Sequence, residues 1–238
     1  MRSLNSFSKS VDIFVETYKY LQKTKYPEKN IVDLKFEWAI SILNKLKIDF
    51  NISGSPAEES SVLFIGNHIS YLDIPLLMAS VRNISFVAKQ ELNYWPIFGE
   101  AARKVNTVFV NRGNTSSRNR AKAIIQNSLE NGSRIAIFPS GTTCIEESKP
   151  WRRGVFEIAQ ALDIWIQPFR ISYSPLRAVA YIDRDFFPVH LYRLFGVNKI
   201  SAQIEFHDPV KIKNPESDSK YWQEWSKQLV EGFNESEH

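Results

Sequence analysis

The sequence is poor in cysteine, in long apolar runs and in glycine-rich loops. Its 238 residues include one cysteine, Cys144, which excludes an internal disulfide and suits a reducing compartment. No apolar stretch reaches the ~18 residues that a membrane-spanning helix needs. The first residues also lack the compact apolar core of a signal peptide. We therefore expect a protein without a membrane span or signal peptide, either soluble or held at a membrane surface.

The motifs of several common function classes are absent as well. There is no HExxH, cysteine cluster, P-loop or glycine-rich dinucleotide loop, so we expect no metal and no nucleotide cofactor. There is no RNP, zinc or basic-zipper pattern, so we expect no nucleic-acid partner. The Gly-x-Ser-x-Gly pentapeptide of serine hydrolases is missing too.

What the chain does have is the composition of a globular protein with a positive charge. Hydrophobic residues make up 43% of it and aromatic residues 13%, which argues against disorder. The net charge of +4 and the pI near 9.0 suit an anionic partner, such as a phosphate ester or a membrane surface. The length fits one large α/β domain with a sizeable core.

Two amphipathic segments open the chain. Apolar residues recur every three or four positions from Leu4 to Leu21, and Pro27 ends this stripe. After Asn30, a residue type that caps helices, a second stripe runs through Ile31, Leu34, Trp38, Ile42 and Leu46. This pattern predicts a helical pair over residues 1–47. The pair either packs over the core or turns part of its apolar face into the lipid interface, as anchors with Lys and Trp do.

Strand and helix patterns alternate through the rest of the chain. Apolar runs predict strands at residues 62–65, 84–88, 106–110, 134–138, 164–172, 178–182 and 202–206. Helices are predicted at 95–104, from a cap at Ser116 or Ser117 to Glu130, at 154–162 and at 219–233. This alternation predicts an α/β fold with a central, mostly parallel sheet of about seven strands and helices on both faces. Ligands of such sheets bind beyond the carboxyl ends of the strands.

One stretch, VLFIGNHISYLDIP at 62–75, combines a predicted strand end with two chemically active side chains. The predicted strand ends at Gly66, and a loop with His68 follows. Asp73 comes five residues after His68. On a helix that spacing turns two side chains about 140° apart, but a turn between strand and helix can bring them together. A histidine held by an aspartate is a general base with a fixed tautomer. The alternative is a loop histidine beside an aspartate that caps the next helix.

The motifs that follow this stretch, in their order, carry a resemblance to a known family. His68-x4-Asp73 precedes FVNR at 109–112 and FPSGT at 138–142. The set resembles the glycerolipid acyltransferase family that includes 1-acylglycerol-3-phosphate acyltransferase. The resemblance runs from about Leu46 to Lys213 and also takes in AKQEL at 88–92, PIFG at 96–99, RG at 153–154 and QP at 167–168.

The resemblance implies an acyltransferase domain at 48–238 that moves a fatty acyl group from a thioester to a lipid. The donor is acyl-CoA or acyl-carrier protein, and the acceptor is the free hydroxyl of 1-acylglycerol-3-phosphate or a related lysophospholipid. His68 is then the base and Asp73 orients its ring, while backbone N–H groups hold the developing oxyanion. Arg112 clamps the acceptor phosphate with its planar fork, and Lys89 and Gly113 assist it.

One position departs from the family pattern. The family usually has Glu where this chain has Ser140, in the loop Ser140, Gly141 and Thr142 that shapes the acceptor site. The change removes a carboxylate beside the expected phosphate, so it affects the identity of the acceptor more than the reaction. Four arginines are candidates for the donor's phosphates, or else plain exposed charges: Arg118, Arg120, Arg152 and Arg153.

Two other functions remain open on the sequence. In a serine-type lipid hydrolase or thioesterase, Ser140 is the nucleophile and His68 its base. A catalytically silent lipid-binding relative is the other possibility, although it would have no use for an intact His68 and Asp73. In each case we expect a peripheral protein at the cytoplasmic face of a membrane, with the helical pair of residues 1–47 facing the lipid.

Overall fold

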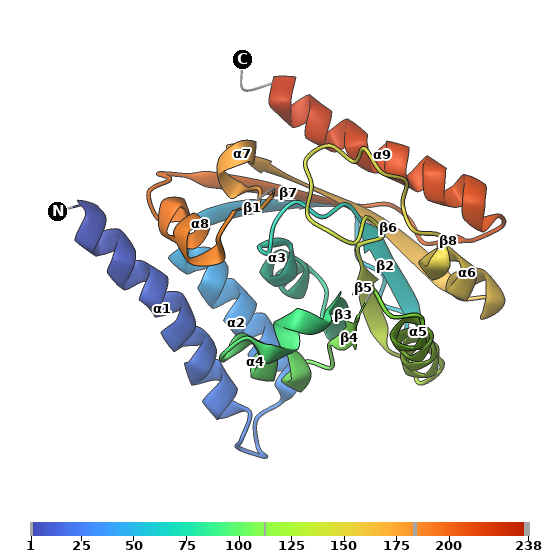
Figure 1. The fold of residues 1–238 in the computed structure, drawn as a ribbon, viewed down its shortest axis with the longest axis horizontal. Coiled ribbons are helices and arrows are strands. Elements are labelled where there is room, and N and C mark those ends of the chain that lie inside the picture. Colours follow the sequence, from blue (N-terminus) through green and yellow to red (C-terminus); the bar gives the residue numbers. More distant parts are fainter. Residues whose placement is uncertain (1, 112, 183–184, 236–238) are drawn as a thin grey trace.

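The computed structural model describes residues 2–111, 113–182 and 185–235, and it is built around one eight-stranded sheet (Figure 1). The order is β1-β7-β6-β2-β5-β3-β4, and β8 pairs with β6. All pairs along this order are parallel except β6 with β7, which confirms the predicted mostly parallel sheet. The strands are β1 Ile48–Ser53, β2 Val62–Gly66, β3 Ile84–Lys89, β4 Val108–Val110, β5 Arg134–Ile137, β6 Trp165–Ser174, β7 Ile200–Phe206 and β8 Val210–Lys211.

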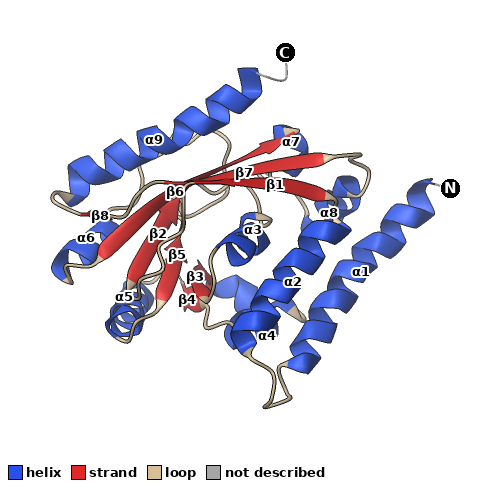
Figure 2. Ribbon diagram, turned by 180° about the vertical axis from the view of Figure 1, so that it is seen from behind, coloured by secondary structure: helices blue, strands red, loops and turns tan. Residues whose placement is uncertain are grey.

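Helices cover both faces of the sheet (Figure 2). One face carries α5 Thr115–Glu130, α6 Gly154–Ala161 and α9 Pro215–Glu235. The other carries α1 Arg2–Lys23, α2 Ile31–Lys45, α3 Asp73–Ser80, η1 Gln90–Tyr94, α4 Phe98–Lys104 and α8 Phe187–Leu194, while the short α7 Leu176–Val179 follows β6. No helix in the described part of the chain is long and apolar enough to cross a bilayer.

The central strand β2 explains why its sequence is apolar throughout. All five of its residues are buried, with Phe64 in the core on one side of the sheet and Leu63 and Ile65 in the core on the other. A strand covered on both faces has no solvent side, so alternation is lost. Its last residue must be glycine, because a Cβ on Gly66 would lie 2.4 Å from the carbonyl oxygen of Phe169.

The two amino-terminal helices form as predicted, and of the two alternatives for their apolar faces the structure shows core packing for α2. Asn30 caps α2 by accepting a hydrogen bond from Val32 N–H at 2.8 Å. Ile42, on the second stripe, is 3% exposed and belongs to the core, so this part of the stripe packs inside the protein. In α1 the apolar stripe is split, since Leu21 is buried while Tyr18 is 51% exposed. The domain boundary after residue 47 stays a prediction, although α2 packs on both α3 and β1.

Several elements differ from the sequence prediction. The prediction of a strand at 178–182 is wrong, because the chain forms α7 there and then continues as a loop. In this loop Tyr181 N–H donates a hydrogen bond to Ile69 O. Residues buried one helical turn apart, Leu176 and Val179, explain this outcome. The edge strand β1, the two-residue strand β8 and the helix α8 were not predicted. β1 buries only Ile48, so its pattern is too weak to identify it.

Several boundaries also move by a few residues. The cap of α5 is Asn114, whose side chain accepts from Ser117 N–H, and not Ser116 or Ser117. α4 begins at Phe98 rather than near residue 95, after the separate turn η1. Asn106 adopts a φ of 60°, as expected of an asparagine at a position where a left-handed backbone is needed. Because the turn at Asn106 takes up the residues before Val108, β4 is only three residues long.

Candidate active site

His68 and Asp73 meet in the turn between β2 and α3. The Nδ1 of His68 lies 2.7 Å from Asp73 Oδ2, and the same oxygen accepts hydrogen bonds from Ile69 N–H at 2.8 Å and Ser70 N–H at 3.1 Å. Asp73 is fully buried and is the first residue of α3, whose N-cap is Leu72. The carboxylate therefore does not cap the helix but turns back onto the loop. A carboxylate on Nδ1 requires the proton there and leaves Nε2 as the basic nitrogen.

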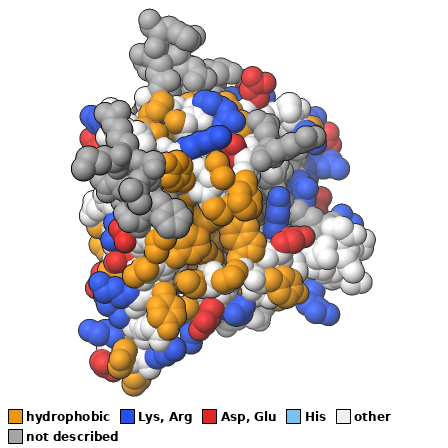
Figure 3. All heavy atoms as spheres, turned by 60° about the vertical axis from the view of Figure 1, so that its left-hand side comes forward, with side chains coloured by type: hydrophobic (Ala, Val, Ile, Leu, Met, Phe, Trp, Pro, Cys, Tyr) orange, Lys and Arg blue, Asp and Glu red, His pale blue; other side chains and the backbone are white. Residues whose placement is uncertain are grey.

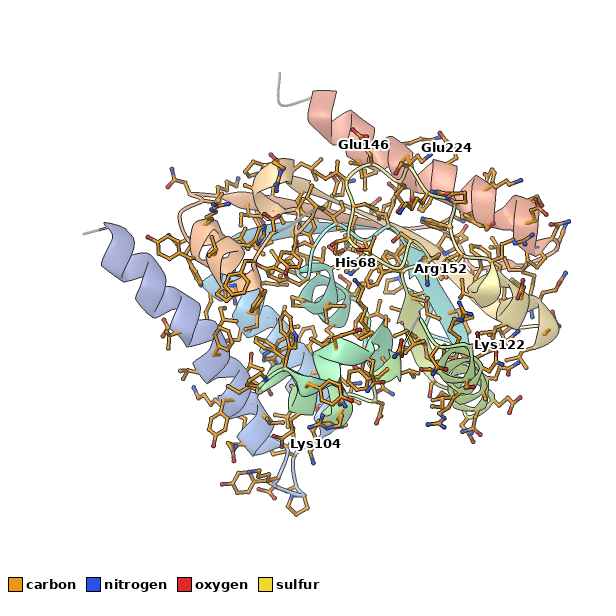
Figure 4. All side chains as sticks on the ribbon, viewed as in Figure 1. His68, Lys104, Lys122, Glu146, Arg152 and Glu224 are labelled. Atoms are coloured by element: carbon orange, nitrogen blue, oxygen red, sulfur yellow. The ribbon has the colours of Figure 1, made fainter. Side chains whose placement is uncertain are left out.

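The His68 ring is fixed by aromatic stacking as well as by its hydrogen bond. It stacks on Phe138 with ring centroids 3.9 Å apart and 12° between the planes, and Phe138 rests edge-on against Phe169. Its side chain remains 19% exposed, so the ring is fixed without being closed off from a substrate. In Figure 4, His68 lies near the centre of the molecule.

A largely apolar cavity of about 510 Å³ opens beside His68. Its walls come from α1, α2, α3, β3, η1, α4 and α8, with the residues after β5 at its mouth. Trp38, Met78 and Phe98 are typical of the lining, which has few polar groups. A cavity of this size and composition is suited to an apolar ligand that is held by shape and burial.

The structure brings some of the predicted site residues to this cavity and leaves others away from it. Gly141, with a φ of 77°, and Thr142 line its mouth, and so does Lys89, exposed at the end of β3. Ser140 Oγ instead donates to Thr142 O at 2.9 Å, within its own loop. Gly113 lies in an exposed turn, and Arg112 falls outside the described residues. The roles of these residues stay predictions.

Several residues that hold the site together were not predicted from the sequence. The side chain of Asn67 accepts from Ile171 N–H and donates to Ile171 O, each at 2.8 Å. Tyr71, inside the motif turn, contacts His190 Nδ1 at 2.9 Å. Tyr173 Oη donates to Asp73 Oδ1 at 2.8 Å. Asn67 and Tyr71 stand within the motif stretch, but the contacts themselves could not be predicted, because each joins residues 100 or more positions apart.

The loop from β5 to α6 is fastened both to His68 and to the carboxyl-terminal helix. Cys144 N–H donates to His68 O at 2.8 Å. On α9, the side-chain amide of Gln223 donates to Lys149 O at 2.8 Å and accepts from Trp151 N–H at 3.1 Å. Burial, followed by the charge of Glu147, raises the pKa of the Cys144 thiol to about 11, so this cysteine is an unreactive thiol at neutral pH.

A histidine fixed by a buried aspartate beside an apolar cavity can move a proton next to an apolar substrate. Comparison with known proteins identifies the family. Residues 47–172, more than half of the chain, match the family model described as Acyltransferase. The chain belongs to this family and is an O-acyltransferase, as the motifs at 68–73, 109–112 and 138–142 indicated.

Curated relatives carry two different acceptor names. A lyso-ornithine lipid O-acyltransferase of Pseudomonas aeruginosa is 32% identical over 73% of this chain and 68% of that protein. A 1-acyl-sn-glycerol-3-phosphate acyltransferase of Neisseria meningitidis serogroup B is 27% identical over 69% of this chain and 67% of that protein. The fold is that of the crystal structure of the 1-acyl-sn-glycerophosphate acyltransferase PlsC from Thermotoga maritima, with a TM-score of 0.72, 20% identity and 98% of each chain covered.

Proposed function

We propose that this O-acyltransferase moves a fatty acyl group from an acyl thioester to the free hydroxyl of a lysolipid. His68 Nε2 takes the proton of the acceptor hydroxyl while the oxygen attacks the thioester carbonyl, and Asp73 stabilises the imidazolium. The carbon–sulfur bond then breaks, and the leaving thiolate receives the proton from the imidazolium. The products are an ester and a free thiol, and the donor is acyl-CoA or acyl-carrier protein with no further cofactor.

The observation that carries this proposal is the meeting of the His68–Asp73 pair with the apolar cavity. Nδ1 is occupied by Asp73, and none of the hydrogen bonds found among the described residues uses Nε2. A thioester whose acyl chain fills the cavity places its carbonyl at the mouth, where His68, Gly141 and Thr142 lie. A positioned general base is worth on the order of 10²–10⁴ in rate.

We expect the acceptor to carry an anionic group that the cationic residues of the site can bind. Lys89 lies at the mouth of the cavity and can bind a phosphate. Arg112, the residue before Gly113 in the sequence, has a planar fork that matches phosphate oxygens. Both residues support 1-acylglycerol-3-phosphate or a related lysophospholipid as the acceptor. A second candidate is a lyso-ornithine lipid, whose headgroup carries a carboxylate and an amine. The higher identity to the Pseudomonas aeruginosa protein favours it, and the resemblance places Ser140, where the family usually has Glu, beside the acceptor headgroup.

A hydrolase with Ser140 as nucleophile is less well supported. The Ser140 hydroxyl donates to Thr142 O, and among the described residues no hydrogen bond joins it to His68. A serine nucleophile needs its base within hydrogen-bonding reach. The hydroxyl of Ser140 is instead suited to shaping the loop.

An exposed apolar surface supports attachment to a membrane. It comprises Val11, Val15 and Tyr18 on α1, Phe186, Val189 and Tyr192 at α8, and Tyr94 and Trp95 in and after η1, all at least 37% exposed. Figure 3 shows hydrophobic side chains gathered over this side of the molecule. The helices that carry this surface also wall the cavity. A bilayer bound there, at the cytoplasmic face, gives lipid substrates a short path to His68.

The test is an assay of the purified protein with labelled palmitoyl-CoA and palmitoyl-carrier protein, each with a panel of lysolipids. We expect a diacyl product with 1-acylglycerol-3-phosphate or with lyso-ornithine lipid, and little free fatty acid when no acceptor is present. The ratio of kcat/KM for the two acceptors assigns the headgroup. Release of fatty acid at the same rate without any acceptor would exclude the transferase function.

The role of the cavity is tested separately by filling it. Ala101 on α4 lines the cavity, whereas Ala123 on α5 is exposed on the opposite side of the sheet. We expect Ala101→Phe to lower kcat/KM for long-chain donors more than for short-chain donors, while Ala123→Phe changes neither. Equal losses for all chain lengths would place the acyl chain elsewhere.

A further inference from the structure

The carboxylate of Asp73 is held from both of its oxygens, and one partner lies outside the family motif. Oδ2 faces His68 and two backbone N–H groups, whereas Oδ1 accepts a hydrogen bond from Tyr173 Oη at 2.8 Å. Both Tyr173 and Asp73 are fully buried. The two oxygens therefore have separate partners, and neither oxygen is left to water.

The geometry of β6 explains how a distant tyrosine reaches this carboxylate. β2 ends at Gly66, opposite Phe169, but β6 continues to Ser174 without β2 beside it. The side-chain amide of Asn67 binds both the N–H and the C=O of Ile171, so it takes the place of the missing strand neighbour. Because side chains alternate along a strand, Tyr173 lies on the same side of β6 as Ile171, beneath the turn that carries Asp73.

The Tyr173 hydroxyl is a donor throughout the working pH range. Burial, together with the negative charge of Asp73, raises the pKa of Tyr173 well above its usual value, so its proton stays in place. An ionised carboxylate accepts hydrogen bonds only, which fixes the direction of this one. The bond is charge-assisted and buried, a combination that makes a hydrogen bond strong and directional.

We propose that Tyr173 is a positioning residue for acyl transfer, acting through Asp73 on His68. Its bond fixes the rotation of the carboxylate about the Cβ–Cγ bond, so that Oδ2 faces Nδ1 and Nε2 points to the cavity. It also withdraws negative charge toward Oδ1, away from the imidazole. This inference rests on the base role of His68 in the proposed function.

The test is the substitution Tyr173→Phe, which keeps the ring and removes only the hydroxyl. We expect kcat to fall roughly tenfold, as for loss of a hydrogen bond to a charged group, with the KM of donor and acceptor unchanged. With more charge left on Oδ2, the imidazole stays protonated to higher pH, so the acid limb of the kcat profile moves to higher pH. The position of that limb does not depend on the amount of folded enzyme, so it remains readable in a destabilised variant.

Ser172→Ala is the matched control. Ser172 is adjacent in β6 and fully buried, and its hydroxyl has no hydrogen-bond partner among the described residues. We expect this variant to keep the kcat and the acid limb of the original protein. The same result for Tyr173→Phe, in a chain whose His68→Ala variant is inactive, would overturn the inference and leave the proposed function standing. An active His68→Ala variant would instead overturn the proposed function.

Discussion

The ammonium group of Lys35 donates a hydrogen bond to the carbonyl oxygen of Ile84 at 3.1 Å, inside the contact between α2 and β3. Lys35 is 5% exposed, and among the described residues no carboxylate lies within ion-pair distance of it. Burial lowers the pKa of Lys35 to about 8. Ile84 begins β3, whereas Lys89 ends it at the cavity mouth, so this buried cation lies at the edge of the sheet opposite His68.

We expect Lys35→Met to increase the free energy of unfolding at pH 7. A lysine with a lowered pKa in the folded state costs stability below that pKa, and the cost disappears as pH rises from about 8 toward 10.5. The gain is on the order of 3 kcal/mol at pH 7 and shrinks across that range. Urea unfolding at several pH values measures it, with Lys104→Met on the exposed side of α4 as control. A gain that is the same at pH 7 and pH 10 would contradict the explanation.

Glu147, in the loop between β5 and α6, is a buried acid with a raised pKa, whereas Lys35 is a buried base with a lowered one. Its carboxylate oxygens are buried without a hydrogen-bond partner among the described residues, and burial raises the pKa of Glu147 to about 7. Such a carboxyl stabilises the fold below about pH 4.5, and that contribution is lost as pH rises through 7. We expect Glu147→Gln to be more stable than the original protein at pH 8, by up to about 3 kcal/mol, and not at pH 5.

Thermal unfolding at pH 5 and pH 8 tests this prediction. The neighbouring Glu146 is exposed, so Glu146→Gln is its control. If both variants show the same difference at the two pH values, Glu147 is not the titrating group.

Substitution of the two motif residues separates catalysis from folding. We expect His68→Ala to lower kcat by at least about 10² while the protein stays folded, because the ring is partly exposed and contributes little core. Asp73→Asn should lose most activity and also cost about 1–3 kcal/mol of stability, because Asp73 is the acceptor for several buried donors. Turnover and circular dichroism of the purified variants measure both effects. Wild-type turnover in His68→Ala would end the general-base mechanism.

Ser140→Ala distinguishes a transferase from a serine hydrolase. In the transferase, the Ser140 hydroxyl makes one neutral hydrogen bond to Thr142 O, so its loss should lower kcat/KM by tenfold at most. In a hydrolase the loss should equal that of His68→Ala, because nucleophile and base act as a unit. The measurement compares the two variants for diacyl product and free fatty acid. Equal inactivity, with fatty acid released without acceptor, would make Ser140 the nucleophile.

The apolar surface over α1 predicts where charge should release the protein from lipid. Val15 and Tyr18 point outward from α1, with 56% and 51% of each residue exposed. We expect Val15→Glu with Tyr18→Glu to reduce sedimentation with phosphatidylglycerol vesicles without lowering the melting temperature. Ile124→Glu on α5, where the residue is 43% exposed on the other side of the sheet, should have no effect. Unchanged binding of the α1 variant would exclude this surface as the attachment site.

The features that the sequence determined by itself are those with a strong local pattern. The run at 62–66 is apolar because both faces of the sheet are covered, and the turn after it can bring His68 to Asp73 because only six residues lie between β2 and α3. The alternation of strands with helices then places every parallel strand end at the same edge. The fold class and the predicted pair of His68 and Asp73 follow from these patterns.

The tertiary structure decided everything that depends on partners far apart in the chain. Nothing near Tyr173 in the sequence shows that its hydroxyl meets Asp73, because the contact joins residues 100 positions apart. The stripe through Ile42 has one helical period whether it faces lipid or core, and only the packing of α2 on α3 and β1 makes it core. Periodicity reports which face of an element is apolar, but what covers that face depends on where the other elements lie.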